Sequence, residues 1–201
     1  MENIILKRFK ESSEVKTRFL KENIPRLLDV VKLISHAFEA GNKLFFFGNG
    51  GSAADAQHLA AEFVNRYIMD RPPLPAIALT TDSSVLTSIS NDFAFNEIFA
   101  KQLRALGKEG DVAVGISTSG NSSNVVKAFE VARELGIKTV ALTGYEGGAV
   151  AKIADVPLVV SSTSTPRIQE AHILIGHVLC ELVEHHLFLK DVAATGGSSG
   201  R

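Results

Sequence analysis

Short apolar runs recur along the chain, each separated from the next by a stretch of helical character. They read LFFF, AIAL, VAVGI, TVAL and PLVV, and none alternates between apolar and polar residues. Strands that are apolar on both faces are typical of parallel sheets covered by helices on each side. Alternation of strands and helices predicts the same architecture. The sequence therefore predicts an α/β three-layer sandwich with a mostly parallel sheet flanked by helices.

The expected elements follow from apolar spacing and from glycine and proline positions. Residues 1–40 are expected to form an N-terminal helical arm that is interrupted and restarted at Pro25. Its apolar faces are of a kind that often packs against a partner subunit. Strands are expected at 44–47, 75–79, 112–116, 138–142 and 156–160. Helices are expected at 53–68, 83–89, 96–106, 122–135, 147–154 and 167–189.

Length and composition indicate one domain, residues 1–192, made of the arm at 1–40 and an α/β core at 41–192. The tail 193–201 has nothing to bury and is expected to be disordered. A net charge of −1 gives no indication of a nucleic-acid partner, and no apolar run reaches the roughly 20 residues of a membrane span. Cys180 is the single cysteine, and no signal peptide opens the chain, so a cytoplasmic location is expected.

One stretch, KLFFFGNGGSAADAQHLAAE at 43–62, joins a strand, a glycine turn and a helix. Ser52 is a favoured N-cap residue directly after the glycines. Free N–H groups and the positive end of the helix dipole at such a turn favour an anion. His58 and Glu62 follow, one helical turn apart. They are either a solvated surface pair or a pair for metal binding or acid–base chemistry.

A second strand-to-helix turn reads STSGNS at 117–122. Four hydroxyl side chains at a helix start suit the oxygens of a phosphate monoester, although Ser and Asn also cap helices without any ligand. The first turn lacks full G-x-G-x-x-G spacing, and neither turn has the lysine of a nucleotide P-loop. A small phosphorylated ligand is therefore favoured over a nucleotide.

Further polar residues occur in the loop SISNDFAF and in the last helix. Asn91 and Asp92 form a turn signal by themselves, but they could reach a ligand at the carboxyl ends of parallel strands. Gln169 and His177 are eight residues apart, about 80° around a helix and about 12 Å along it. One metal ion meets both only at the limit of their reach. Either Gln169 precedes the regular helix, or the two residues serve different sites across a subunit boundary.

Four motifs together carry a family resemblance: GNGGSAADAQHLAAEF, NDFAFN, GISTSGNSSNV and RIQEAHILIGHVLCELVE. In this order they resemble the phosphoheptose isomerases (sedoheptulose 7-phosphate isomerases) of the sugar isomerase (SIS) superfamily, whose fold is flavodoxin-like. The resemblance extends to about residue 190. It implies conversion of D-sedoheptulose 7-phosphate to D-glycero-D-manno-heptose 7-phosphate, a first step toward ADP-heptose for lipopolysaccharide core or capsule. It also implies a homotetramer with active sites at subunit interfaces and one zinc ion per subunit.

The same resemblance assigns roles to individual residues. The implied zinc ligands are His58, Glu62, Gln169 and His177. The implied sugar contacts are Asn49, Gly50, Gly51, Ser52, Asn91 and Asp92, with Glu62 and Gln169 also touching substrate. The implied phosphate contacts are Ser117, Thr118, Ser119 and Ser122. Glu62 is the expected base, and His177 is the expected acid or proton relay. An acidic residue that precedes Arg167 in some members has no counterpart here, where Thr165 and Pro166 stand.

Two rival functions remain at this point. One is a non-catalytic SIS protein that binds the replication initiator or senses sugar phosphates. A pure binder need not keep all four of the implied zinc ligands, and all four are present, which favours the enzyme. The other is an isomerase of a pentose or hexose phosphate, because the sequences of the two turns do not determine how many carbons the sugar has.

Overall fold

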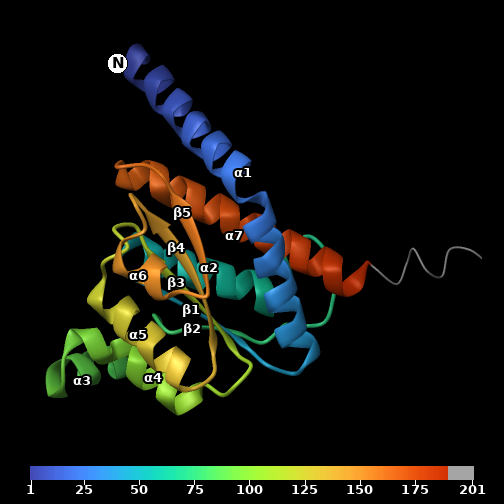
Figure 1. The fold of residues 1–201 in the computed structure, drawn as a ribbon, viewed down its shortest axis with the longest axis vertical. Helices are drawn as coiled ribbons and strands as arrows, with labels where there is room; N and C mark the ends of the chain where they lie inside the picture. The colour runs from blue at the N-terminus through green and yellow to red at the C-terminus, as the bar shows by residue number, and fades with distance from the viewer. Residues whose placement is uncertain (190–201) are drawn as a thin grey trace, which may run out of the picture.

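The computed structural model describes residues 1–189 and confirms the predicted sandwich (Figure 1). Its sheet has five strands in the order β2-β1-β3-β4-β5, and every neighbouring pair is parallel. The strands are β1 (Leu44–Gly48), β2 (Ala76–Ala78), β3 (Val112–Ser117), β4 (Lys138–Gly144) and β5 (Val156–Val160). The tail predicted at 193–201 lies outside the described residues.

Two layers of helices cover the sheet. The helical elements are α1 (Glu2–Glu39), α2 (Gly51–Val64), α3 (Ser83–Asp92), the 3₁₀ turn η1 (Phe95–Glu97), α4 (Ile98–Leu106), α5 (Ser123–Glu134), α6 (Gly148–Ile153) and α7 (Thr165–Phe188). Helices α1, α2 and α7 pack on one face, and α4, α5 and α6 on the other. No helix within residues 1–189 is long and apolar enough to cross a membrane.

Strand β1 shows why the apolar runs do not alternate with polar residues. Leu44 and Phe46 contribute to the core beneath α1, α2 and α7, whereas Phe45 and Phe47 contribute to the core beneath α4 and α5. Because successive side chains point to opposite faces, a strand covered on both sides buries every residue. All five residues of β1 are buried.

The predicted interruption of the N-terminal arm at Pro25 is wrong, because α1 is one helix with this proline inside it. A proline in a helix interior costs about 3 kcal/mol. Buried residues lie on both sides of it, among them Phe19 before and Leu27 and Val30 after. Each fully buried apolar side chain contributes about 1.5–3 kcal/mol, so the continuous apolar stripe outweighs the lost hydrogen bond.

Helix α2 also differs from its predicted range of 53–68. It begins at Gly51 with Gly50 as N-cap, at φ +56°, so Ser52 is buried within the first turn and is not the cap. It ends at Val64 because the chain beyond it is held by hydrogen bonds from distant residues, described below. The other predicted elements are confirmed with small shifts at their ends.

His172 of α7 is buried beneath the sheet, with Nε2 3.0 Å from the carbonyl oxygen of Thr143. Burial lowers the pKa of His172 from 6.5 to about 4, and the hydrogen bond to Thr143 opposes this shift only in part. Between these two values the unfolded chain binds a proton that the folded chain does not. Stability is therefore lost as the pH falls from 6.5 toward 4.

Replacing His172 by phenylalanine is expected to flatten the pH dependence of unfolding. The wild type should lose up to about 1.4 kcal/mol of unfolding free energy per pH unit more than His172→Phe in this window. Denaturant unfolding of both proteins between pH 4 and pH 7 measures the difference. Equal slopes would contradict a histidine that is neutral and buried.

Candidate active site

The two predicted anion turns lie side by side at the carboxyl edge of the sheet. β1 and β3 are neighbours, and the chain leaves β1 into α2 on one face and β3 into α5 on the other. The strand order is that of flavodoxin-like folds, whose ligands bind where the winding of the chain reverses, between β1 and β3. The glycine turn and the serine turn therefore lie at the position where such folds bind ligands.

A pair of side-chain amides joins these two turns. Asn49 donates from Nδ2 to Oδ1 of Asn124 at 2.9 Å, and Asn124 donates from Nδ2 to Oδ1 of Asn49 at 2.7 Å. Asn124 lies in the first turn of α5 and is 1% exposed. Sequence reasoning missed it, because an asparagine near a helix start indicates only capping. The pair fixes the position of one turn relative to the other.

The serine turn is shaped by internal contacts. Ser117 and Ser122 share a hydrogen bond between their Oγ atoms at 2.8 Å. Ser122 is the N-cap residue of α5, but its side chain makes no capping bond. The first amides of α5 are thus left for another acceptor, and a phosphate suits them. Gly120 has a φ of +66°, and a Cβ added to it would lie 2.0 Å from the carbonyl oxygen of Gly147. The missing side chain of Gly120 therefore lets the serine turn pass close to Gly147.

Gln169 lies against the glycine turn. A Cβ added at Gly51 would lie 2.4 Å from Nε2 of Gln169, so the missing side chain makes room for this amide. α7 begins at Thr165, so Gln169 is inside the regular helix. The alternative in which Gln169 precedes the helix is therefore wrong. The amide belongs with the glycine turn and Asn49.

His58, Glu62 and His177 gather further along α2 and α7. The Nε2 atoms of His58 and His177 are 2.9 Å apart, and Nε2 of His58 is 3.4 Å from Oε1 of Glu62. The side chains of His58 and Glu62 are 49% and 24% exposed. Gly176 permits this approach, because a Cβ there would lie 2.4 Å from Cδ2 of the buried Leu59.

The side chains of this trio, His58, Glu62 and His177, are of the types that bind zinc, although the two histidines here contact each other directly. Two imidazoles and a carboxylate are a donor set that catalytic zinc sites use, with a fourth position left open. Two nitrogens at ligand distance from a tetrahedral ion lie about 3.3 Å apart, a few tenths of an ångström more than here. No three His, Cys, Asp or Glu side chains within residues 1–189 already form a metal-binding group.

A carboxylate that sequence reasoning did not single out lies one turn before His58. Asp55 of α2 has its Oδ2 atom buried, and this atom has no hydrogen-bond partner within the described chain. Burial raises the pKa of Asp55, and the nearby His58 lowers it in part. In the sequence, Asp55 is only an aspartate near the start of an alanine-rich helix, and this pattern does not indicate a functional role.

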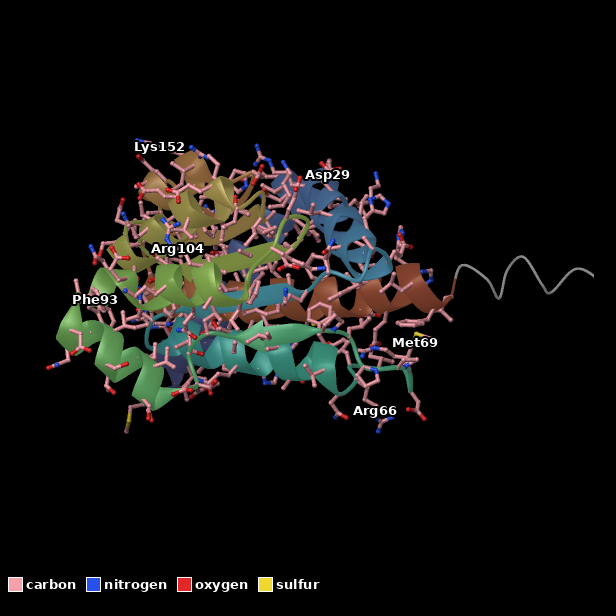
Figure 2. All side chains as sticks on the ribbon, turned by 90° about the horizontal axis from the view of Figure 1, so that it is seen from below. Asp29, Arg66, Met69, Phe93, Arg104 and Lys152 are labelled. Atoms are coloured by element: carbon pink, nitrogen blue, oxygen red, sulfur yellow. The ribbon has the colours of Figure 1, made fainter. Side chains whose placement is uncertain are left out.

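Asn91 and Asp92 lie apart from the trio. They end α3, are exposed, and hydrogen-bond each other at 2.8 Å; within residues 1–189 they form no hydrogen bond with another predicted site residue. Phe93, the next residue, lies at the opposite end of the molecule from Met69, whose loop adjoins His177 (Figure 2). A single chain thus does not bring all the predicted residues together.

Comparison with known proteins identifies the family. A family model described as the SIS domain matches residues 8–144. The phosphoheptose isomerase of Nitratidesulfovibrio vulgaris is 53% identical over 185 residues, which cover 92% of this chain and 89% of the relative. The chain belongs to the phosphoheptose isomerases of the SIS domain family.

Solved structures agree with this assignment. The phosphoheptose isomerase from Neisseria gonorrhoeae is similar with a TM-score of 0.86 at 43% identity, over 91% of this chain and 98% of that one. The phosphoheptose isomerase from Francisella tularensis has a TM-score of 0.88 at 39% identity, over 91% and 97% of the two chains. A non-catalytic SIS protein, the rival expectation, is not favoured by these relatives, since each is named an isomerase.

Proposed function

We propose that the protein is an aldose–ketose isomerase that converts D-sedoheptulose 7-phosphate to D-glycero-D-manno-heptose 7-phosphate. The contact of His58, Glu62 and His177, on α2 after the glycine turn and on α7, carries this proposal. It places a base and a proton relay together on one chain, and the serine turn is proposed to hold the phosphate of the same substrate. The phosphoheptose isomerase name of relatives at 53% identity supports the choice of sugar.

Isomerisation moves one proton between two carbons and one between two oxygens. In the proposed reaction, the carboxylate of Glu62 removes a proton from C1 of the ketose, and the electron pair forms the enediol double bond. His177 carries a proton to O2 and later removes the one on O1. Glu62 then returns its proton to C2, which leaves the carbonyl at C1. An imidazole suits the relay because its unperturbed pKa lies near neutrality.

The serine turn would hold the far end of the substrate. Ser117, Thr118, Ser119 and Ser122, with the first amides of α5, are proposed to bind the phosphate. Asn49, Gly50, Gly51 and Ser52 are proposed to contact the sugar, together with Gln169, Asn91 and Asp92. Fixing both ends of the sugar makes the proton transfer effectively intramolecular.

One zinc ion per subunit is part of the proposal. Its proposed ligands are His58, Glu62, Gln169 and His177. Bound there, zinc would polarise the substrate carbonyl and stabilise negative charge on the enediolate. Because Gln169 lies at the glycine turn, eight residues before His177, it is proposed to serve the zinc site of a neighbouring subunit.

A homotetramer with shared active sites follows from the same reasoning. Exposed apolar residues on α1 support an assembly, among them Ile5 and Phe9 at 58% and 75% exposure near the projecting end (Figure 1). Leu20 of α1 and Leu174 of α7, at 50% and 45%, border a further apolar groove between these helices. We place the enzyme in the cytoplasm, at the first step toward ADP-heptose for lipopolysaccharide or capsule.

The decisive experiment is incubation of the purified protein with D-sedoheptulose 7-phosphate, before and after zinc chelation. Formation of the aldose, lost on chelation and restored by zinc, is the expected result. Pentose and hexose phosphates in the same assay test the substrate. No product from the heptose phosphate would refute the proposal, and a faster reaction of a shorter sugar would change the substrate.

Mixed tetramers test whether the site is shared. Glu62→Gln and Gln169→Ala, each inactive alone, should recover activity after subunit exchange, because one chain then supplies an intact trio and its neighbour an intact Gln169. Glu62→Gln with His177→Ala is the matched control. These two residues adjoin His58 in one chain, so no mixed site is complete. Equal behaviour of the two mixtures would contradict a shared site.

A further inference from the structure

Tyr67, which no motif singled out, covers the imidazole of His177. The two rings are stacked, with centroids 5.4 Å apart and planes inclined by 25°. The other ring near His177 is that of His58, at 5.1 Å and 57°. Tyr67 therefore lies over one face of His177 while His58 contacts its edge nitrogen. An imidazole held in this way has little freedom to turn about its χ2 bond.

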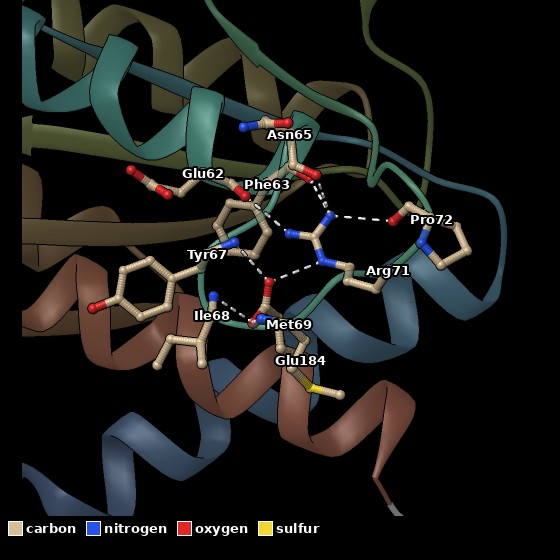
Figure 3. A network of polar contacts seen from close by, with 9 residues as sticks. All are labelled: Glu62, Phe63, Asn65, Tyr67, Ile68, Met69, Arg71, Pro72 and Glu184. Atoms are coloured by element: carbon tan, nitrogen blue, oxygen red, sulfur yellow. Dashed lines mark hydrogen bonds and ion pairs between the residues drawn. The ribbon is translucent and has the colours of Figure 1, made fainter.

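The position of Tyr67 is fixed by a buried carboxylate on α7. Glu184 accepts hydrogen bonds from three successive backbone amides, those of Tyr67, Ile68 and Met69, at 2.8, 3.0 and 3.0 Å (Figure 3). Its side chain is 1% exposed. Three charge-assisted bonds to one carboxylate fix the loop after α2 against α7. The helix that carries His177 thus also places the ring that covers it.

Arg71 joins the same network to the end of α2. Its Nε donates to Oε1 of Glu184 at 3.0 Å, and its Nη2 donates to the backbone carbonyl of Glu62 at 2.9 Å. Its Nη1 donates to the carbonyl of Phe63 at 2.6 Å (Figure 3). These carbonyls belong to the last turn of α2, where no further helical amide can reach them. The backbone of the proposed base and the ring over the proposed relay therefore share one buried anchor.

We propose that Tyr67 is a positioning residue for His177 and that the Glu184–Arg71 pair holds it in place. This inference rests on the proposed function for its catalytic meaning. The ring matters and the hydroxyl does not, because the hydroxyl forms no hydrogen bond within residues 1–189. Misplacing a reacting group by about 1 Å can cost a hundredfold in rate, so small rotations of His177 are consequential.

Steady-state kinetics of three variants test the proposal. Tyr67→Leu should lower kcat at least about tenfold and change KM less than about twofold, because the relay moves while the phosphate site stays. Tyr67→Phe should restore kcat to within about twofold of wild type, since the ring is kept. Ile68→Ala is the matched control, because its side chain is exposed while its amide still binds Glu184. A wild-type kcat in Tyr67→Leu would overturn the proposal.

A spectroscopic arm does not depend on turnover. The rings of Tyr67 and His177 are stacked, so the ring current of Tyr67 should shift the ring-proton resonances of His177. These resonances are assigned by comparison with His177→Gln in chelator-treated protein. Tyr67→Leu should move these signals, and Tyr67→Phe and Ile68→Ala should leave them in place. Unmoved signals in Tyr67→Leu would overturn the positioning role. If the wild type isomerises no sugar phosphate, the proposed function is refuted. The resonance shifts would still test whether Tyr67 positions His177.

Discussion

Replacing Glu62 by glutamine is expected to lower kcat by about 10²- to 10⁴-fold, the usual contribution of a general base. Glutamine keeps the shape of the side chain but cannot accept the proton from carbon. The proposed phosphate contacts at the serine turn are untouched, so substrate should still bind with little change in affinity. Steady-state kinetics together with calorimetric titration of the inactive variant separate the two effects. Zinc content, measured by mass spectrometry, shows whether the variant also loses metal.

The matched control is Glu181→Gln on α7. Glu181 is an exposed glutamate on the helix that carries His177, so its change of charge is similar but no role in the reaction is expected. Its kcat should equal that of wild type. Full activity of Glu62→Gln with zinc bound would assign the base elsewhere, and Asp55, one turn earlier than His58, would be the next residue to test.

Local sequence patterns predicted the helices and strands, but they failed where contacts with distant residues determine the end or the continuity of a helix. The strands followed from runs such as that of β1, because burial on both faces leaves a signature in the sequence itself. The end of α2 did not, since Glu184, more than a hundred residues away, accepts the amides of Tyr67, Ile68 and Met69. Pro25 misled in the same way, because packing on both sides outweighs a local preference.

Much the same division applies to the site. The turns after β1 and β3 could be predicted as ligand loops, because carboxyl ends of parallel strands meet at one edge. The contact of His58 with His177 depends on the close approach of α2 and α7 at Gly176, and a glycine inside a helix does not reveal this. The partners Asn124 and Tyr67 carry no chemical signature until tertiary structure places them.

Replacing Arg71 by methionine is expected to lower the free energy of unfolding by about 3–5 kcal/mol. The side chains of Arg71 and Glu184 are 2% and 1% exposed, so the variant leaves a buried carboxylate without its cation. It also removes the hydrogen bonds that Arg71 donates to the carbonyl oxygens of Glu62, Phe63 and Pro72. Arg104→Met is the control, because the Arg104–Glu134 pair is closer, at 2.7 Å against 3.0 Å, but its side chains are 52% and 56% exposed. An exposed pair contributes about 0–1 kcal/mol.

The contribution of the Glu184–Arg71 pair should also appear in the pH dependence of the wild type's unfolding free energy. The amides of Tyr67, Ile68 and Met69, together with Arg71, hold the pKa of Glu184 below its usual 4.5, although burial opposes them. Its stabilisation is therefore complete above pH 4.5 and is lost as the pH falls through the lower folded pKa. Denaturant unfolding from pH 7 to pH 3 should show this loss in wild type and in Arg104→Met. Arg71→Met should lose less stability over this pH range, because without the cation the folded-state pKa of Glu184 lies nearer its unfolded value. If Arg71→Met and Arg104→Met destabilise equally, the buried pair is not the anchor that holds Tyr67 over His177.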